Sequence, residues 1–328
     1  MLLALALGLG ACAVPVPEFT PPPTEATAYP VMDESQLQRV LAGVNETLQE
    51  ADAAESRAEL TDRITGLAER MRGWEYALAR ATEEADLDEP YTPQPLGTDP
   101  AVAAVAATSE WPRWVMVITD PPEGGNLPLL LALTQEGPRD LYSLAGWVRL
   151  LPGVTTPQMH APASGSAQLG PQAEGLVLSP EAAVEAYAEL LSGEETEEGE
   201  AFAEEDPYRE ILDAEFEALS DSLEVAGRVR QVTTPVGSAL ALETFDGGAI
   251  VFGGLKTVHT YEKTVSGAKM MVGDQVSALN DGQAEVDSEL TAEYRHMVAF
   301  YIPPEGSEEP VNVLGAERVL RDVKEPEE

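Results

Sequence analysis

The chain of 328 residues is short of cysteine, of histidine and of basic side chains, and each shortage excludes a class of protein. Its one cysteine, Cys12, cannot form an intramolecular disulfide, so a disulfide-stapled scaffold is excluded. Three scattered histidines and this cysteine provide no pair at the spacing of zinc ligands. We therefore expect no metal and no other cofactor.

Basic residues are the second shortage. Lys and Arg number 19 against 58 Asp and Glu, which gives a formal net charge of −39. Proteins bind phosphate backbones through clustered Lys and Arg, so this composition excludes nucleic acid as a partner. It also excludes polybasic attachment to anionic lipids. The hydrophobic share of 44% is typical of globular domains, and the length suits two of them.

A long hydrophobic run is missing as well. Leu2 to Leu9 is apolar and uncharged, but a membrane-spanning helix needs about 20 such residues. The run fits a signal peptide, and the small residues Gly10 and Ala11 follow it. Leu9-Gly10-Ala11-Cys12 resembles the lipobox of bacterial lipoproteins, although no Lys or Arg precedes the run. This resemblance implies cleavage before Cys12 and lipidation of its thiol. The alternative is an unprocessed apolar N-terminus with a chance cysteine.

The segment that follows is rich in proline and threonine, so it favours an extended tether over a helix or a central strand. At about 3.1 Å per residue, it could hold a domain roughly 50 Å from a lipid surface. We expect residues 1–12 to be the signal peptide and lipobox, 13–32 the tether, 33–178 a first α+β domain and 179–328 a second α+β domain.

The first predicted domain begins with helices. Asp33 or Ser35 caps a helix whose apolar residues recur at helical spacing as far as Ala51. Ser56 to Glu59 reads as a capping box that opens a second helix, which continues to about Ala81. Two glycines are expected to break this second helix: Gly66 and Gly73.

Strands follow the helices in this half. Residues 114–119, 127–135 and 141–151 are apolar runs separated by turn residues, which predicts successive antiparallel strands. Residues 152–172 are rich in Pro, Gly and Ser and read as a loop. Residues 175–178 then form a short apolar run, which we expect to be a strand.

The second predicted domain repeats this order. Ser179-Pro180 and Asp206-Pro207 are capping residues followed by proline, so each begins a helix. The acidic run from Glu194 to Asp206 lacks the spacing of a calcium loop and reads as a solvated loop. Asp246-Gly247-Gly248 predicts a hairpin turn. Strands are expected at residues 239–244, 249–265, 269–279, 290–302 and 311–323.

A weak repeat links the two halves. Residues 115–124 and 297–306 both run from an apolar strand into Pro-Pro-Glu-Gly, which is turn chemistry that could also arise twice by chance. We predict an α+β fold of two tandem units, each with N-terminal helices packed on a curved antiparallel sheet. This order resembles the cone-shaped fold of nuclear transport factor two and the cystatin-like group. The whole chain also resembles uncharacterised actinobacterial secreted lipoproteins, a resemblance that implies no known activity.

Two pairs of residues are the candidate site. His259 and Tyr261 lie two apart on one expected strand, and Tyr294 and His296 lie two apart on another, so each pair shares a face. If both faces point inward, an acid/base site is conceivable in a pocket of the second domain. Histidines that are satisfied in the core or exposed on the surface are the alternative.

The hypothesis is a non-enzymatic lipoprotein at the outer face of the cell membrane, attached through lipidated Cys12. Its partner would be a cell-envelope protein or a small ligand. The alternative is a small-molecule enzyme that uses the pocket around His259 and His296. A closed polar cavity in which a histidine meets Asp, Glu or Tyr within hydrogen-bond distance would favour the enzyme. Histidines on solvent-facing strand positions would exclude it.

Overall fold

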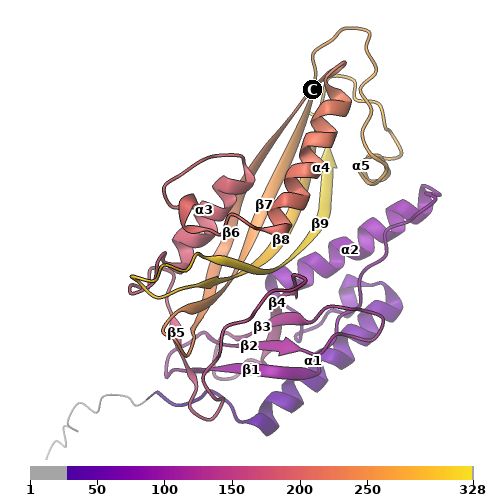
Figure 1. Cartoon of the computed structure of the whole chain (residues 1–328). Helices are drawn as coiled ribbons and strands as arrows, with labels where there is room; N and C mark the ends of the chain where they lie inside the picture. Colours follow the sequence, from indigo (N-terminus) through magenta and orange to yellow (C-terminus); the bar gives the residue numbers. More distant parts are fainter. Residues whose placement is uncertain (1–27, 327–328) are drawn as a thin grey trace, which may run out of the picture.

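The strands form a closed barrel in the computed structural model, which describes residues 28–326 (Figure 1). Their order is β1-β2-β3-β4-β9-β8-β7-β6-β5, and every pair is antiparallel except β1 and β5, which close the barrel in parallel. The strands are β1 (Pro100–Ala107), β2 (Arg113–Thr119), β3 (Leu129–Gln135), β4 (Ser143–Leu150), β5 (Ser166–Leu169), β6 (Gly227–Glu243), β7 (Ala249–Lys263), β8 (Glu289–Ile302) and β9 (Asn312–Lys324).

Five α-helices cover this barrel among the described residues, and each is too short or too polar to cross a membrane. Figure 1 shows α4 lying along the long strands β6 to β9, away from α1. The helices are α1 (Glu34–Ala54), α2 (Gly66–Glu84), α3 (Pro180–Leu191), α4 (Pro207–Leu223) and α5 (Asp274–Leu279), with short 3₁₀ helices at Arg57–Glu59 and Gly199–Ala201.

Three of the predicted helix starts are confirmed. Asp33 caps α1 in a capping box, in which its carboxylate accepts from the backbone N–H of Gln36 at 2.8 Å and the Gln36 side chain accepts from Asp33 N–H. Ser179 and Asp206 cap α3 and α4, and a proline occupies the first helical position after each. Local capping chemistry therefore determines where these helices begin.

The second helix was predicted wrongly. Ser56 caps no α-helix with its side chain, and α2 begins only at Gly66, whose φ of +62° is a backbone conformation that favours glycine. The helix then runs unbroken through Gly73. A Cβ at Gly73 would lie 2.6 Å from the Arg57 side chain, so glycine allows a close contact there and does not end the helix.

Several short segments also differ from the expectation. Residues 269–279 are not a strand, because α5 occupies Asp274–Leu279. The expected loop 152–172 contains β5, and the expected strand 175–178 makes only an isolated bridge at Leu176. β1 was not predicted. Short apolar runs do not distinguish helix from strand by periodicity, so tertiary pairing decides them.

The fold is mixed α+β, as expected, but two tandem units are not confirmed. β4 from the first half pairs with β9 from the second through Arg149↔Ala316 and Leu150↔Gly315. The larger hydrophobic core also contains buried residues from both halves, such as Trp147 and Met297. The barrel therefore joins the two halves through shared hydrogen bonds and a shared core. The boundary at residues 178 and 179 stays a prediction, as does the resemblance to the cone-shaped fold.

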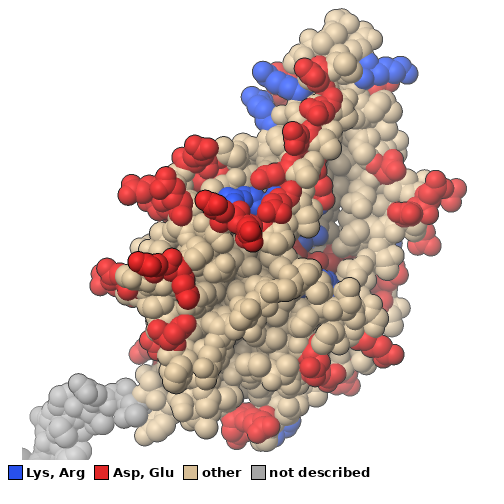
Figure 2. Space-filling view, viewed as in Figure 1, with Lys and Arg blue, Asp and Glu red and all other residues tan. Residues whose placement is uncertain are grey.

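Acidic side chains outnumber basic ones on the visible surface (Figure 2). Figure 2 shows Asp and Glu spread over the visible face, whereas Lys and Arg form a few small groups, mainly near the tip where α4 and the long strands end. This distribution agrees with the net charge of −39.

Candidate functional site

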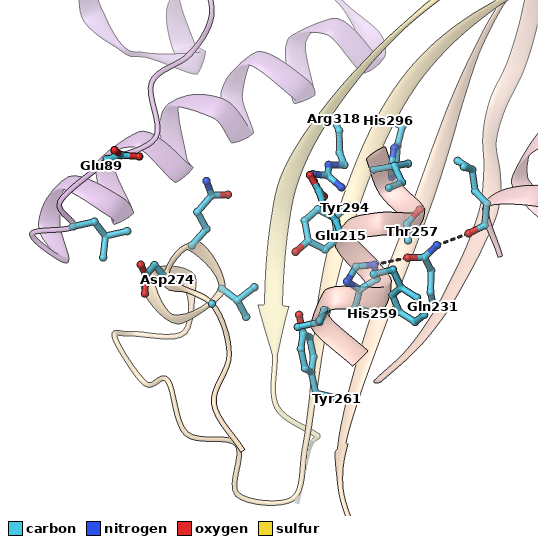
Figure 3. Close-up of a pocket in the computed structure, with 18 of the residues that line it drawn as sticks. Glu89, Glu215, Gln231, Thr257, His259, Tyr261, Asp274, Tyr294, His296 and Arg318 are labelled. Carbon is cyan, nitrogen blue, oxygen red and sulfur yellow. Dashed lines mark hydrogen bonds and ion pairs between the residues drawn. The ribbon is translucent and has the colours of Figure 1, made fainter. Parts of the chain in front are cut away.

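All four candidate side chains line one cavity of about 840 Å³. β6 to β9 form its floor, and Leu212, Glu215, Phe216 and Leu219 of α4 form a wall. Thr257 of β7 pairs directly with Tyr294 of β8, and residues two apart on a strand share a face. This register brings His259, Tyr261, Tyr294 and His296 to the same side of the sheet, as the sequence predicted (Figure 3).

His259 is held by a glutamine. Its Nε2 lies 2.8 Å from Oε1 of Gln231, whose amide nitrogen donates to the backbone carbonyl of Leu191. This orientation of the amide makes His259 Nε2 the donor, so Nδ1 carries a lone pair. Nδ1 is buried and has no hydrogen-bond partner among the described residues. The ring packs near two aromatic rings, with centroid distances of 5.6 Å to Phe216 and 4.9 Å to Tyr294.

His296 is held by a tyrosine from α4. Asp206 caps this helix by accepting from the backbone N–H of Tyr208 at 3.1 Å, which positions the first turn. The Tyr208 hydroxyl then lies 2.7 Å from His296 Nδ1. Burial raises the pKa of Tyr208, so its hydroxyl keeps the proton that it can donate. The other ring nitrogen of His296, Nε2, is buried without a hydrogen-bond partner among residues 28–326.

Both histidines are neutral at physiological pH. Burial, together with the nearby Arg318 charge, lowers the pKa of His259 to about 4. Burial lowers the pKa of His296 well below its ordinary value, and Arg318, His259 and Arg295 act in the same direction. The floor of the cavity therefore presents two neutral imidazoles.

One ion pair links α4 to the floor of the cavity. Arg318 of β9 donates to Glu215 of α4 at 2.7 Å, and its guanidinium lies 5.4 Å from the centre of the Tyr294 ring. The Glu215 side chain is 53% exposed, so the cavity is open to solvent at this point. Glu215 neutralises Arg318, which therefore offers little net charge to an anionic ligand.

The rim of the cavity on the side away from α4 is acidic. It consists of the segment after α2 and the start of α5, and Figure 3 shows Glu89 and Asp274 across the cavity from His259. The carboxylates of this rim belong to Asp86, Asp88, Glu89 and Asp274. A cationic group at the mouth of the cavity would be attracted by them.

The packing of α4 is sparse. Only Leu212 and Leu223 of its 17 residues are buried, whereas nine of the 19 residues of α2 are buried. Helices with few buried side chains open at low free-energy cost. α4 is therefore held less firmly than α2.

This arrangement suits binding better than proton transfer. A general base works best when its pKa lies near the operating pH, and both histidines have pKa values far below it. Neither histidine of the cavity forms a hydrogen bond with a carboxylate among residues 28–326, so no carboxylate orients either imidazole ring. Within the same residues, no group of three or more His, Cys, Asp and Glu is arranged to hold a metal.

Sequence reasoning found the strand residues and missed their partners. Gln231, Tyr208 and Arg318 come from β6, α4 and β9, and no local motif marks them. Phe216 belongs to the apolar stripe of α4, which indicated packing only. The predicted lipidation residue Cys12 and its lipobox, Leu9, Gly10 and Ala11, lie outside the described residues.

The part of the chain that matches a known family includes the whole cavity. A family model described as a domain of unknown function (DUF8094) matches residues 28–324, which include every residue that lines the cavity. Neither a curated protein nor a solved structure matches the chain. Because the family model spans nearly all of its length, the chain belongs to the DUF8094 family.

Proposed function

We propose that this protein is a lipid-anchored extracytoplasmic protein that binds a small polar ligand in the cavity beneath α4. The observation that carries the proposal is the pair of buried, unpaired ring nitrogens, Nδ1 of His259 and Nε2 of His296. Buried polar atoms in folded proteins nearly always have a hydrogen-bond partner. A buried polar atom without a partner lowers the stability of the fold by about 1–3 kcal/mol. A ligand that supplies hydrogen-bonding groups to these nitrogens, once α4 moves aside, removes that penalty.

The lining specifies the chemistry of this ligand. His259 Nδ1 accepts, so the ligand carries a hydroxyl or N–H group. The aromatic rings of Phe216 and Tyr294 favour a ligand with an apolar face. The acidic rim and the net charge of −39 disfavour anions. A neutral or cationic molecule of metabolite size fits these constraints, and a volume of about 840 Å³ is ordinary for such sites.

Membrane attachment through lipidated Cys12 is the second part of the proposal. The described chain starts at the end of the molecule opposite the tip of α4 (Figure 1). A tether at that end would hold the cavity away from the outer face of the cell membrane, where it can meet ligands or a cell-envelope protein. Intact mass of the membrane fraction tests the anchor. A wild-type chain without added lipid mass, at the same location as Cys12→Ala, contradicts it.

The tandem arrangement of two α+β units is retained as part of the proposal. Its support is the pair of Pro-Pro-Glu-Gly turns after β2 and β8, where Gly124 and Gly306 have φ values of +81° and +82°. In this interpretation the second unit supplies the floor of the cavity and α4, while the first supplies the rim from Asp86 to Glu89.

An acid/base enzyme is the second candidate. His296 Nδ1 and the Tyr208 hydroxyl meet at 2.7 Å beside a polar cavity, which is the kind of contact such an enzyme needs. The low pKa values of both histidines weaken this candidate, since a base that holds its proton so weakly abstracts protons poorly.

Histidine-ring NMR of the full chain tests ligand binding. Panels of monosaccharides and primary amines are added, and the ring nitrogen signals of His259 and His296 are followed. We expect at least one compound to shift both signals and to leave His160 unchanged, because His160 lies outside the cavity. His259→Phe should abolish the response, and the matched control His160→Phe should retain it. Equal shifts at all three histidines, or no shift with any compound, would contradict the proposal.

A further inference from the structure

The barrel closes through a narrow seam that leaves one edge of β1 open. β1 pairs with β2 from Pro100 to Val105, but β5 pairs with it only at Ala106 and Ala107. On the side of β5, the edge from Pro100 to Val105 therefore has no neighbouring strand among residues 28–326. Such an edge offers backbone N–H and C=O groups to a further strand.

The backbone direction along β1 shows which groups are offered. A Cβ on Gly165, next to β5, would lie 3.3 Å from the carbonyl oxygen of Val105, so this carbonyl points toward β5. Backbone groups alternate along a strand, so the N–H and C=O of Ala103 point to the same side. Both residues line a groove of about 710 Å³ that runs beside the open edge.

The groove has two walls. The start of α1, from Pro30 to Gln38, forms one, and the loop Ala161-Pro162-Ala163 forms the other. These walls recess the edge, so a free extended chain can reach it more easily than the edge of a second folded barrel. The six residues from Pro100 to Val105 span about 20 Å at about 3.3 Å per residue, which suits a peptide of five or six residues.

The sequence of β1 indicates that another chain covers its open edge. Exposed edge strands usually carry charged residues that prevent unwanted pairing, yet residues 101–107 are only Ala and Val, and Val102 is 46% exposed. The small side chains Ala101, Ala103 and Ala163 leave room for larger apolar side chains from a partner. The charged residues that line the groove, Asp33 and Glu34, are both acidic.

We infer that this groove binds an extended segment of a partner protein, which adds to β1 as a strand. The segment carries apolar residues at alternate positions, facing the alanines, and a Lys or Arg that meets Asp33 and Glu34. Main-chain hydrogen bonds supply affinity in this mode of recognition, and the alternate side chains supply specificity. The inference does not depend on the cavity beneath α4, which is lined by different residues.

The test uses two synthetic peptides and the full chain. The first is a six-residue peptide of alternating Val and Thr with one terminal Lys. The second has the same side chains but is N-methylated at alternate residues, which removes the donors that face β1. We expect calorimetry to show at least tenfold weaker binding of the methylated peptide, and we expect slower amide exchange at Ala103 with the first peptide only.

Two exposed substitutions connect the binding to this groove. Ala163→Phe fills the groove from its loop wall, and it should weaken binding of the first peptide at least tenfold. Glu34→Lys should weaken binding of the peptide that carries Lys and should strengthen binding of a matched peptide that carries Glu in its place. Equal affinity for both backbone forms, no binding of either form, or insensitivity to Ala163→Phe would overturn the inference. A doubled mass of the free chain in sedimentation that Ala163→Phe returns to a single mass would also overturn it, since a second copy would then occupy the edge.

Discussion

Two buried polar clusters lie where helices cover the sheet, and their central side chains differ in how completely they are paired. Beneath α2, Arg72 donates to Asp52 at 2.8 Å through two nitrogens and to Glu75 at 2.7 Å. Arg72 and Glu75 are only 2% and 1% exposed. Beneath α4, both histidines keep one unpaired ring nitrogen. All four side chains are buried, so the number of hydrogen-bond partners separates Arg72 and Glu75 from the two histidines.

Strand alternation places the two clusters on either side of the same strand. Glu317 and Arg318 are neighbours on β9. Glu317 lies 3.3 Å from Arg149 in the cluster beneath α2, whereas Arg318 pairs with Glu215 beside the cavity. Successive side chains of a strand point to opposite faces. Pairing separates Arg72 and Glu75 from the two histidines, but the cluster beneath α2 is itself incomplete, because Arg149 Nε and Glu317 Oε2 are buried without a hydrogen-bond partner among residues 28–326.

The largest expected effect is the loss of a partner beneath α2. Arg72→Met leaves the Glu75 carboxylate buried without its cation, and we expect the free energy of unfolding to fall by about 3–5 kcal/mol. Urea unfolding measures it. The matched control is Arg70→Met on the exposed face of α2, which should change stability by less than about 0.5 kcal/mol. A loss below about 1 kcal/mol for Arg72→Met would show that pairing beneath α2 contributes little.

The second prediction concerns pH and the cavity. The pKa of His259 is about 4 in the folded state and 6.5 in the unfolded state, so the unfolded chain binds the proton more readily between these values. His259 therefore destabilises the fold as the pH falls from 6.5 to about 4, with a slope of up to about 1.4 kcal/mol per pH unit. His259→Phe should remove this slope. Parallel pH profiles of wild type and variant in urea unfolding would contradict the burial of a neutral histidine.

The third prediction has the opposite sign and lies beneath α2. Burial, together with the neighbouring Glu75, raises the pKa of Glu317 to about 7, above its ordinary 4.5. The folded state then holds the proton more tightly, so this contribution to stability is complete below pH 4.5 and is lost as the pH rises to about 7. Burial also raises the pKa of Glu75, so the two carboxyl groups titrate as a coupled pair. Glu317→Gln should flatten the profile between pH 4.5 and 7, and a profile unchanged by this variant would refute the shift.

The smallest effect is expected at the ion pair over the cavity. Glu215 is half exposed, so Glu215→Gln should lower the free energy of unfolding by only about 0.2–1 kcal/mol, and by less in high salt. Exchange of the backbone amides of α4 should nevertheless become faster, because the helix loses a fastening. Unchanged exchange in α4 would mean that Tyr208 and the apolar side chains hold the helix without the ion pair.

Much of the local structure was predictable because its causes are local. The caps at Asp33, Ser179 and Asp206 act within three residues, and the hairpin at Asp246 depends on two glycines that follow it. Errors occurred where a distant contact decides. Gly73 lies inside α2, where the absence of a Cβ leaves room for Arg57, and β5 is a strand only because β1 and β6 flank it.

The candidate site, too, has features that the sequence predicts and features that depend on the tertiary structure. The sequence by itself determined that His259 and Tyr261 share one strand face and that Tyr294 and His296 share another, because strand alternation is a local property. Only the tertiary structure decided that both faces meet in one cavity, since the pairing of β7 with β8 and the position of α4 depend on contacts across the chain. It also decided that Gln231 and Tyr208 each satisfy one ring nitrogen and leave the other unpaired.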